Sequence, residues 1–451
     1  MMTPCTFRAS SSSRGVGARA RRRWRASSFS TTLATRACRA LARFESWNDD
    51  WNAADASARA RVRGASCDKV FACAWVDART VVFGTKCNRV FEVDVPTRTS
   101  MKTSVAREVF INGADERARG GTYATCVNAT REVVLASGGD AHDVCLLRFR
   151  SDRDDDDDDD DASGLETSRS SSSSSSLAPY CALRGHTDVV YGADFVTRDV
   201  VATASRDGCV KIWRAPAPPM TDADAAPQPT SRGALGTVHI ATSGPATRVR
   251  GVKHVHDVSC PTLATITTHG HISSIDVDTA SCVNHWPMRG YIETSCIATN
   301  GSIIAAGSRT HIGLCDFRTS RLFDSVALPR RSADSARSLS FVGGDHLVVG
   351  GGRGTIAFFD IRARRWLMTS APSSDGVTWH APLEFELVHD APCVPFEESL
   401  VGAAMWADED ARSLLLPAIF CHAFDETFAR LVVGGGPLHA SLFGSFAGVW
   451  S

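Results

Sequence analysis

The sequence has little excess charge and no long apolar run, and each absence excludes a class of protein. The formal net charge is -1 at pH 7, so no overall field draws the chain toward nucleic acid, and any basic site has to be local. No apolar stretch approaches the roughly 18 residues of a membrane-spanning helix, which predicts a soluble protein. The 15 cysteines form no C-x-x-C pair and follow no secretory signal, which favours reduced thiols in an intracellular compartment.

Signatures of catalysis and of bound cofactors are also missing. The sequence contains no phosphate-binding loop, no Rossmann glycine pattern, no paired-carboxylate motif and no G-x-S-x-G turn. Two H-x-H pairs, His254 with His256 and His269 with His271, alternate as metal ligands can, but neither has an identifiable third ligand. We therefore expect a binding protein with no metal and no cofactor.

Residues 1–66 are predicted to be a basic N-terminal extension. Residues 1–44 contain ten arginines and no acidic residue, a composition found both in nuclear basic tracts and in transit peptides. We expect a nuclear and cytoplasmic protein, with organelle targeting as the alternative. Leu33 and Leu41 share one face of a short amphipathic helix predicted over residues 31–44, which could target the protein or dock a partner.

A pattern of two β-rich runs around a tight turn recurs seven times between residues 67 and 451. The copies span 80–95, 133–150, 200–215, 262–278, 303–318, 347–362 and 431–451. Each resembles the two central strands of a propeller blade. The sequence therefore predicts an all-β, seven-bladed β-propeller, with the C-terminal segment paired in the last blade.

The spacing between copies is uneven, which indicates insertions between blades. Only two gaps, of 41 and 44 residues, match the roughly 40 to 45 residues of an uninterrupted blade. We predict insertion loops at 151–179, 216–246 and 367–418. The first holds Asp154–Asp161 and Ser170–Ser176, a composition that favours a disordered, solvated loop.

The third repeat resembles the WD40 repeat, because Gly185 and His186 open it, a Ser-Arg-Asp-Gly turn follows, and Trp213 ends it. The resemblance implies a buried hydrogen-bonded tetrad of His186, Ser205, Asp207 and Trp213. Serine, histidine and aspartate together also suggest a hydrolase triad, but the spacing and the missing nucleophile turn favour the structural role.

Several cations occupy equivalent positions in different repeats, and these positions lie at one mouth of the predicted channel. The residue that closes the second strand is Lys86, Arg206, Arg309 or Arg353 in four of the repeats. Two further arginines, Arg250 and Arg337, stand at the starts of first strands. A cationic mouth in a neutral protein suits carboxylate or phosphate ligands, whereas scattered surface charge is the simpler alternative.

Two consecutive repeats end in a D-x-R motif, Asp316-Phe317-Arg318 and Asp360-Ile361-Arg362. Both resemble the D-x-R box of cullin-4 ligase substrate receptors, in which the box meets the DNA-damage-binding adaptor subunit. The alternative is a solvated strand end with a local ion pair, which would contribute little to stability.

Further segments resemble the cullin-4-associated receptors that recognise C-terminal di-glutamate degrons. They are GTKCN at 84–88, FFDIRARRW at 358–366 and the last twenty residues. The resemblance implies a non-enzymatic substrate receptor that holds its adaptor through the D-x-R boxes and a helix containing Leu33 and Leu41. It also implies that substrates with acidic C-termini bind the mouth. The implied degron contacts are Lys86, Arg206, Arg248, Arg250 and Arg337, to which register adds Arg309 and Arg353.

Two other functions compete with this interpretation. A WD40 scaffold for RNA processing or chromatin would suit the basic extension and the acidic run equally well. A propeller enzyme ranks last because the predicted mouth is cationic and lacks metal-binding acids. Small molecules, membranes and nucleic acid are not expected as partners.

Overall fold

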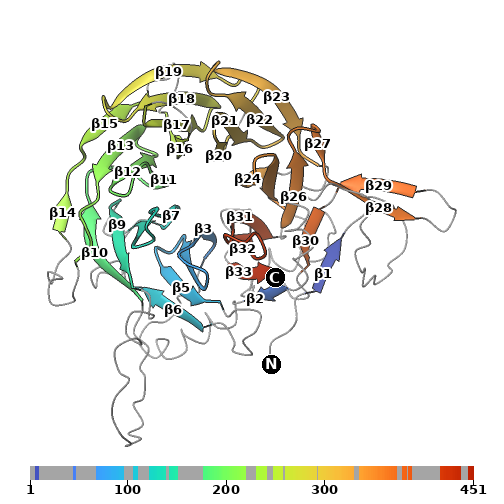
Figure 1. Cartoon of the computed structure of the whole chain (residues 1–451), viewed down its shortest axis with the longest axis horizontal. Coiled ribbons are helices and arrows are strands. Elements are labelled where there is room, and N and C mark those ends of the chain that lie inside the picture. The colour runs from blue at the N-terminus through green and yellow to red at the C-terminus, as the bar shows by residue number, and fades with distance from the viewer. Residues whose placement is uncertain are drawn as a thin grey trace, which may run out of the picture.

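Seven sheets, each built around antiparallel strands, stand around a central opening, as Figure 1 shows. The structure is a computed structural model, and it describes part of the chain. The described residues are 6–9, 44–46, 68–95, 105–109, 121–138, 142–150, 176–219, 230–240, 247–256, 260–291, 293–329, 335–372, 378–382, 384–388, 417–437 and 445–450.

The first three blades follow one another along the chain, each counted from the channel outward. Blade one contains β3 (Val70–Trp75), β4 (Thr80–Thr85), β5 (Val90–Asp94) and β6 (Val105–Val109). Blade two contains β7 (Thr125–Val127), β8 (Val133–Ser137), β9 (Val144–Phe149) and β10 (Leu177–Leu183). Blade three contains β11 (Val190–Phe195), β12 (Val200–Ser205), β13 (Cys209–Arg214) and β15 (Gly236–His239).

The next three blades repeat this order. Blade four contains β16 (Val249–Val255), β17 (Thr262–Thr267), β18 (His271–Asp276) and β19 (Ser281–Pro287). Blade five contains β20 (Cys296–Asn300), β21 (Ile303–Gly307), β22 (His311–Asp316) and β23 (Arg321–Ala327). Blade six contains β24 (Ala336–Val342), β25 (His346–Gly351) and β26 (Thr355–Asp360), with β27 (Arg365–Trp366) and β30 (Glu384–Val388) both paired to β26.

The seventh blade joins the two ends of the chain. It contains β31 (Pro417–Phe424), β32 (Leu431–Pro437), β33 (Phe446–Trp450) and, at its outer edge, β2 (Phe44–Ser46). Phe44 lies opposite Trp450 and Ser46 opposite Gly448. The predicted pairing of the C-terminal segment is confirmed, and the N-terminal strand closes the blade in addition.

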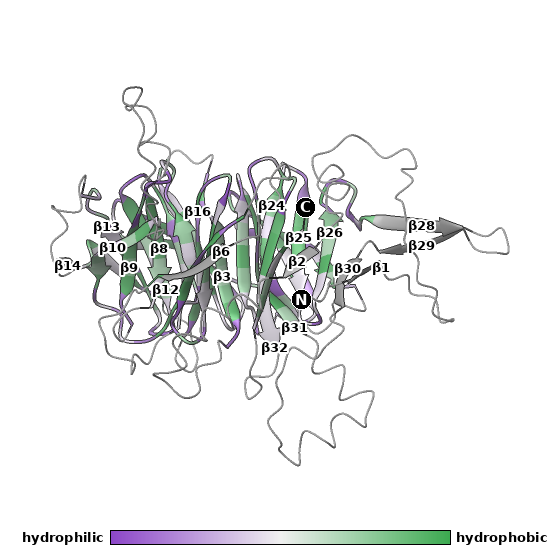
Figure 2. Cartoon of the chain, turned by 90° about the horizontal axis from the view of Figure 1, so that it is seen from below, coloured by the Kyte–Doolittle hydropathy of each residue, from purple (hydrophilic) through white to green (hydrophobic). Residues whose placement is uncertain are grey.

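The fold class is confirmed, and each of the seven repeats forms the second and third strands of a blade. These strands are buried on both faces and pack between neighbouring blades, as Figure 2 shows by the apolar colour of the sheets. Phe83 and Val93 of blade one, for example, cluster with Val432 and Val449 of blade seven. A fully buried side chain of this kind stabilises the fold by about 1.5–3 kcal/mol.

The predicted insertions contain additional strands. Residues 216–246 include β15 and β14 (Thr230–Arg232), and β14 pairs in parallel with β10. Residues 367–418 include β30 and a hairpin of β28 (Met368–Pro372) and β29 (Thr378–Pro382), which stands away from the ring in Figure 1.

The N-terminal predictions are described only in part. β1 (Thr6–Ala9) pairs with β30 at the edge of blade six. Residues 31–43 of the proposed helix, including Leu33 and Leu41, lie outside the described residues, and Phe44 at its predicted end begins the strand β2. The Asp/Ser segment from 151 to 175 also lies outside the described residues. No helix in the described ranges is long and apolar enough to cross a membrane.

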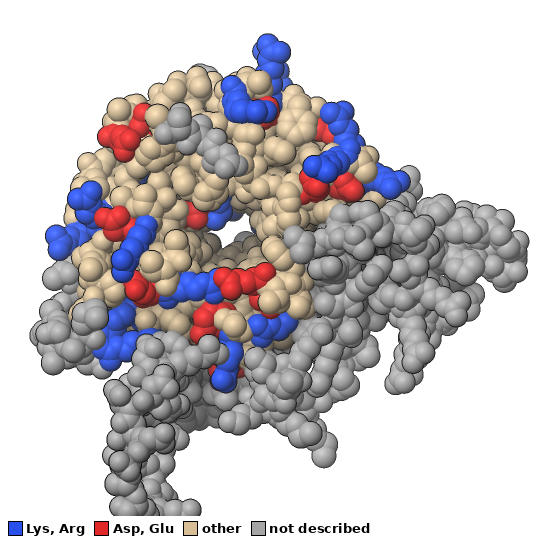
Figure 3. Space-filling view, viewed as in Figure 1, with Lys and Arg blue, Asp and Glu red and all other residues tan. Residues whose placement is uncertain are grey.

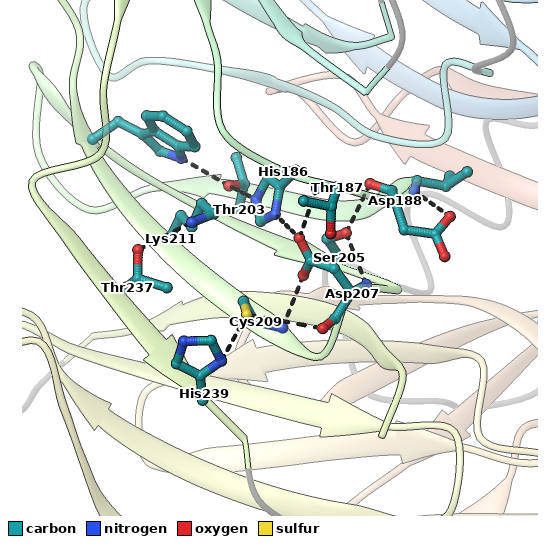
Figure 4. A network of polar contacts seen from close by, with 12 residues as sticks. His186, Thr187, Asp188, Thr203, Ser205, Asp207, Cys209, Lys211, Thr237 and His239 are labelled. Atoms are coloured by element: carbon teal, nitrogen blue, oxygen red, sulfur yellow. Dashed lines mark hydrogen bonds and ion pairs between the residues drawn. The ribbon is translucent and has the colours of Figure 1, made fainter. Parts of the chain in front are cut away.

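The WD40-like tetrad of blade three exists with one different member (Figure 4). His186 Nδ1 lies 2.8 Å from an Asp207 carboxylate oxygen, and its Nε2 lies 2.7 Å from Thr203 Oγ1. The indole N–H of the fully buried Trp213 donates to the same Thr203 oxygen at 2.8 Å. Ser205 instead donates to the Asp188 carbonyl at 2.8 Å, so Thr203 occupies the place that the resemblance gave to Ser205.

Candidate functional site

The antiparallel order of the strands brings the predicted cations of five blades to the same end of those blades. The second strand of a blade ends where its innermost strand begins, so both features lie at the same face of the ring. A cavity of about 440 Å³ opens there, and all of its lining residues except Lys86 come from the innermost strands or the two residues before them. Figure 3 shows the central opening of the ring.

One residue from each blade forms a ring around this cavity, which we call the inner ring. In five innermost strands the pairing register shifts by one residue at this position, as in a β-bulge. A bulge re-aims the extra side chain. In blade order the inner ring is Phe71, Tyr123, Tyr191, Arg250, Ser295, Arg337 and Phe420.

Four members of the inner ring are aromatic and form a continuous arc. Phe71 lies between Phe420 and Tyr123, with ring centroids 4.8 and 4.7 Å away. Tyr123 meets Tyr191 edge to face at 5.3 Å. The guanidinium of Arg250 lies over the Tyr191 ring at 4.0 Å, so the aromatic arc ends on a cation and orients it.

Arg250 and Arg337 are the cations of this cavity that have no acidic partner. Among the described residues, no carboxylate lies within ion-pair distance of either guanidinium. Burial, with a further contribution from the charge of Arg250, lowers the pKa of Arg337 from its usual value. Its buried Nε has no hydrogen-bond partner within the described part of the chain. This half of the ring therefore offers donors to an anion.

Lys86 also lines the cavity, but a carboxylate already holds its ammonium. Asp68 Oδ2 lies 2.6 Å from Lys86 Nζ, and Asp68 Oδ1 lies 3.2 Å from Lys69 Nζ. Burial lowers the pKa of Lys69, and the Asp68 charge opposes that shift. The sequence prediction missed Lys69, because a lysine at the start of a strand gives no sign of burial.

The remaining predicted cations lie at the same face but do not line the cavity. Arg206 is exposed and pairs with Asp188 at 3.4 Å. Arg248 and Arg309 are exposed, and Arg353 is half-buried. The structure thus brings together Lys86, Arg250 and Arg337 and leaves the other four predicted residues outside.

The aromatic members of the inner ring were absent from the prediction, although the sequence does carry a signal for them. Each follows the same pattern, a bulky residue followed by a small one at the start of an innermost strand. The small residue is required because neighbouring blades touch there. A Cβ added to Gly192 would lie 2.8 Å from the Cα of Gly251, so a larger side chain would push two blades apart.

The two D-x-R motifs lie at the opposite face, at the ends of β22 and β26. Arg318 is 71% exposed and contacts Asp316 of its own motif at 2.9 Å, an interaction that lowers the pKa of Asp316. Arg362 is 81% exposed and contacts Asp345 at 2.9 Å. Asp360 accepts a backbone hydrogen bond in the turn that follows it. Both arginines are thus held at an open surface.

The histidine pairs form no metal site in the described ranges. His254 and His256 lie 4.5 Å apart between ring centroids, and His271 stacks on His285 at 5.0 Å. No group of three or more His, Cys, Asp or Glu side chains there is arranged to hold a metal ion.

A family comparison covers most of the chain. The family described as the DDB1- and CUL4-associated factor 12 beta propeller matches residues 58–149 and 173–451. The match includes every strand that contributes to the inner ring, and the part left out between its two segments contains the run Asp154–Asp161. This chain belongs to the DDB1- and CUL4-associated factor 12 β-propeller family.

Proposed function

We propose that this protein is the substrate-recognition subunit of a cullin-4 RING ubiquitin ligase, and that its cavity binds acidic C-terminal tails. Family membership supports the receptor role. One observation carries the ligand assignment: Arg250 and Arg337 face a single cavity and have no acidic partner among the described residues. The chain then contributes binding, and its ligase partners carry out the chemistry.

The shape and polarity of the cavity fit the end of a peptide. A tail that ends in Glu-Glu presents three carboxylates, and arginine binds a carboxylate with two parallel N–H donors. The aromatic arc beside the arginines lowers the local dielectric constant, which strengthens the contacts between arginine and carboxylate. A channel mouth about 440 Å³ in volume admits one or two residues.

The ligand assignment is tested by titrating three peptides and one nucleic acid against the full-length protein. The peptides share one sequence and end in Glu-Glu, in amidated Glu-Glu or in Gln-Gln, and the nucleic acid is a short single-stranded RNA. Selective binding of the free Glu-Glu tail is expected. Equal affinity for all four ligands would instead favour the RNA-processing scaffold.

Tyr191 is expected to act on ligand affinity through Arg250. Its ring lies 4.0 Å from the guanidinium, and cation–π contacts stabilise by about 0.5–2 kcal/mol. Tyr191→Leu should therefore weaken binding of the Glu-Glu peptide roughly two- to thirtyfold. Tyr191→Phe keeps the ring and should bind like the wild type. Equal losses in both variants would show that the hydroxyl, not the stacking, matters.

We further propose that the D-x-R face docks the ligase adaptor. Blades five and six contact each other directly, because Arg364 pairs with Asp324 at 3.8 Å and the Trp366 indole donates to the Ala327 carbonyl at 3.2 Å. Arg318 and Arg362 therefore project from one rigid surface.

Replacing both Arg318 and Arg362 with alanine should reduce co-purification of the adaptor and leave the fold intact. Exposed ion pairs contribute only about 0–1 kcal/mol to stability, so the melting temperature should change little. Arg214→Ala is a matched control, since Arg214 ends β13 at the same face of the ring in blade three and is 69% exposed. Unchanged adaptor recovery with the double variant would contradict the docking proposal.

A further inference from the structure

Not every cation of the cavity is available to an anionic ligand, because acidic side chains behind the cavity wall already neutralise some of them. Five cations line it, Lys69, Lys86, Arg250, Lys253 and Arg337, and no acidic residue is among its described lining residues. Behind the wall, Asp194 pairs with Lys253 at 3.6 Å and raises the pKa of that lysine. Asp68 pairs with both Lys69 and Lys86.

Asp68 is placed to act on the part of the cavity that faces the ligand. Its carboxylate is only 3% exposed, whereas the Lys86 side chain that it contacts is 33% exposed. The Asp68 backbone N–H donates to Cys87 Sγ at 3.2 Å, and the Lys86 N–H donates to the Asp68 carbonyl at 3.1 Å. The acid is therefore fixed against the turn that carries Lys86, and its charge reaches the cavity through that lysine.

We propose that Asp68 is a specificity-determining residue, a built-in counter-ion that limits how much negative charge the cavity accepts. This inference rests on the proposed function. With Asp68 in place, a ligand finds two arginines without acidic partners and a lysine whose charge is already shared. A compact carboxylate ligand satisfies the arginines, whereas a phosphate-rich polyanion is repelled by Asp68 and gains little from Lys86.

The charge-neutral variant Asp68→Asn distinguishes this role from a positioning role. A unit charge about 6 Å from a bound anion changes its affinity by roughly threefold to a hundredfold at effective dielectric constants between those of water and a protein surface. We expect Asp68→Asn to bind the Glu-Glu peptide at least about threefold more tightly at low ionic strength. If Asp68 merely held Lys86 in place, the same variant would bind more weakly, and that result, or no change, would overturn the inference.

Ligands of higher charge provide the second readout. Inorganic pyrophosphate and a short single-stranded RNA should gain more affinity than the peptide in Asp68→Asn, so that selectivity for the carboxylate tail falls. The gain should shrink as salt screens the charges. A gain for the peptide with none for pyrophosphate or RNA would contradict a counter-ion role.

Matched variants control for folding and for general charge effects. Asp188→Asn removes an acid of the same face that is 37% exposed and pairs with Arg206 outside the cavity lining, and its effect should be less than about twofold. If Asp68→Asn is unstable because Lys69 loses this contact, Asp68→Asn/Lys69→Met is compared with Lys69→Met, and the double variant should bind the Glu-Glu peptide at least about threefold more tightly than that reference. Equal affinity in these two folded variants would also overturn the inference. If the wild-type protein did not bind the Glu-Glu peptide, the proposed function would be refuted. The pyrophosphate titration would still test the counter-ion role of Asp68.

Discussion

Replacing Arg250 and Arg337 together with alanine is expected to weaken binding of a Glu-Glu peptide by about two to four orders of magnitude. Each guanidinium can form charge-assisted hydrogen bonds, which contribute about 1.5–3 kcal/mol apiece. The loss of two such contacts costs roughly 3–6 kcal/mol if they act independently. Isothermal titration of wild type and the double variant measures the loss directly.

Arg206 offers a control at the same face of the propeller. It is exposed, pairs with Asp188 and lies outside the cavity lining, so Arg206→Ala should change peptide affinity by less than about threefold. Arg250→Lys/Arg337→Lys keeps both charges but loses the planar forks, and should fall between wild type and the alanine double variant. If the alanine double variant bound the peptide as tightly as the wild type, the cavity would not be the site that binds the carboxylates.

The architecture was predictable because the blade interiors leave a strong trace in the sequence. The second and third strands are buried on both faces, so they appear as apolar runs such as TVVFGT and LVVGGG, separated by turns. Strand pairs that depend on distant segments left no such trace. β2 is three residues long and pairs with a strand about 400 residues away, and β14 lies in a Pro- and Ala-rich segment.

The candidate site was predictable only as far as strand register determines it. Register identified the face of the ring on which Lys86, Arg206 and Arg250 lie. It could not show which cations already have acidic partners, because Asp68 and Asp188 come close to Lys86 and Arg206 only in the folded chain. Phe71, Tyr191 and Phe420 of the inner ring were missed for a related reason, since the bulge that turns each of them into the cavity is a property of strand pairing.

The tetrad shows the same limit on a smaller scale. Ser205 and Thr203 are two residues apart on β12, so their side chains lie on the same face of the strand. Sequence spacing alone cannot decide which hydroxyl meets His186. In the folded blade Thr203 lies opposite Lys211, two residues before Trp213, and within reach of the Trp213 indole. Ser205 lies nearer the turn and binds its backbone there.

The wall of the cavity contains a buried histidine that links the stability of the ring to pH. His422 of β31 is 8% exposed and contacts Ser338 Oγ through Nδ1 and Ser340 Oγ through Nε2, both at 2.7 Å. Ser338 Oγ also donates to the Ile419 carbonyl, which assigns the imidazole proton to Nδ1 and leaves Nε2 to accept from Ser340. Burial lowers the pKa of His422 to about 4.

The protein is expected to lose roughly 3 kcal/mol of unfolding free energy through His422 alone as the pH falls from about 6.5 to about 4. The unfolded chain binds a proton on this histidine near pH 6.5, whereas the folded chain resists it until about pH 4, so the stabilisation is complete above the unfolded pKa and declines below it. Urea denaturation across this range, in wild type and in His422→Gln, isolates the contribution, because His346 and His254 also have lowered pKa values and titrate in both proteins. The glutamine variant should show a shallower decline in unfolding free energy than wild type. Parallel pH profiles for the two proteins would mean that His422 has the same pKa in the folded and the unfolded chain, and that burial at the junction of blades six and seven does not exclude the charge.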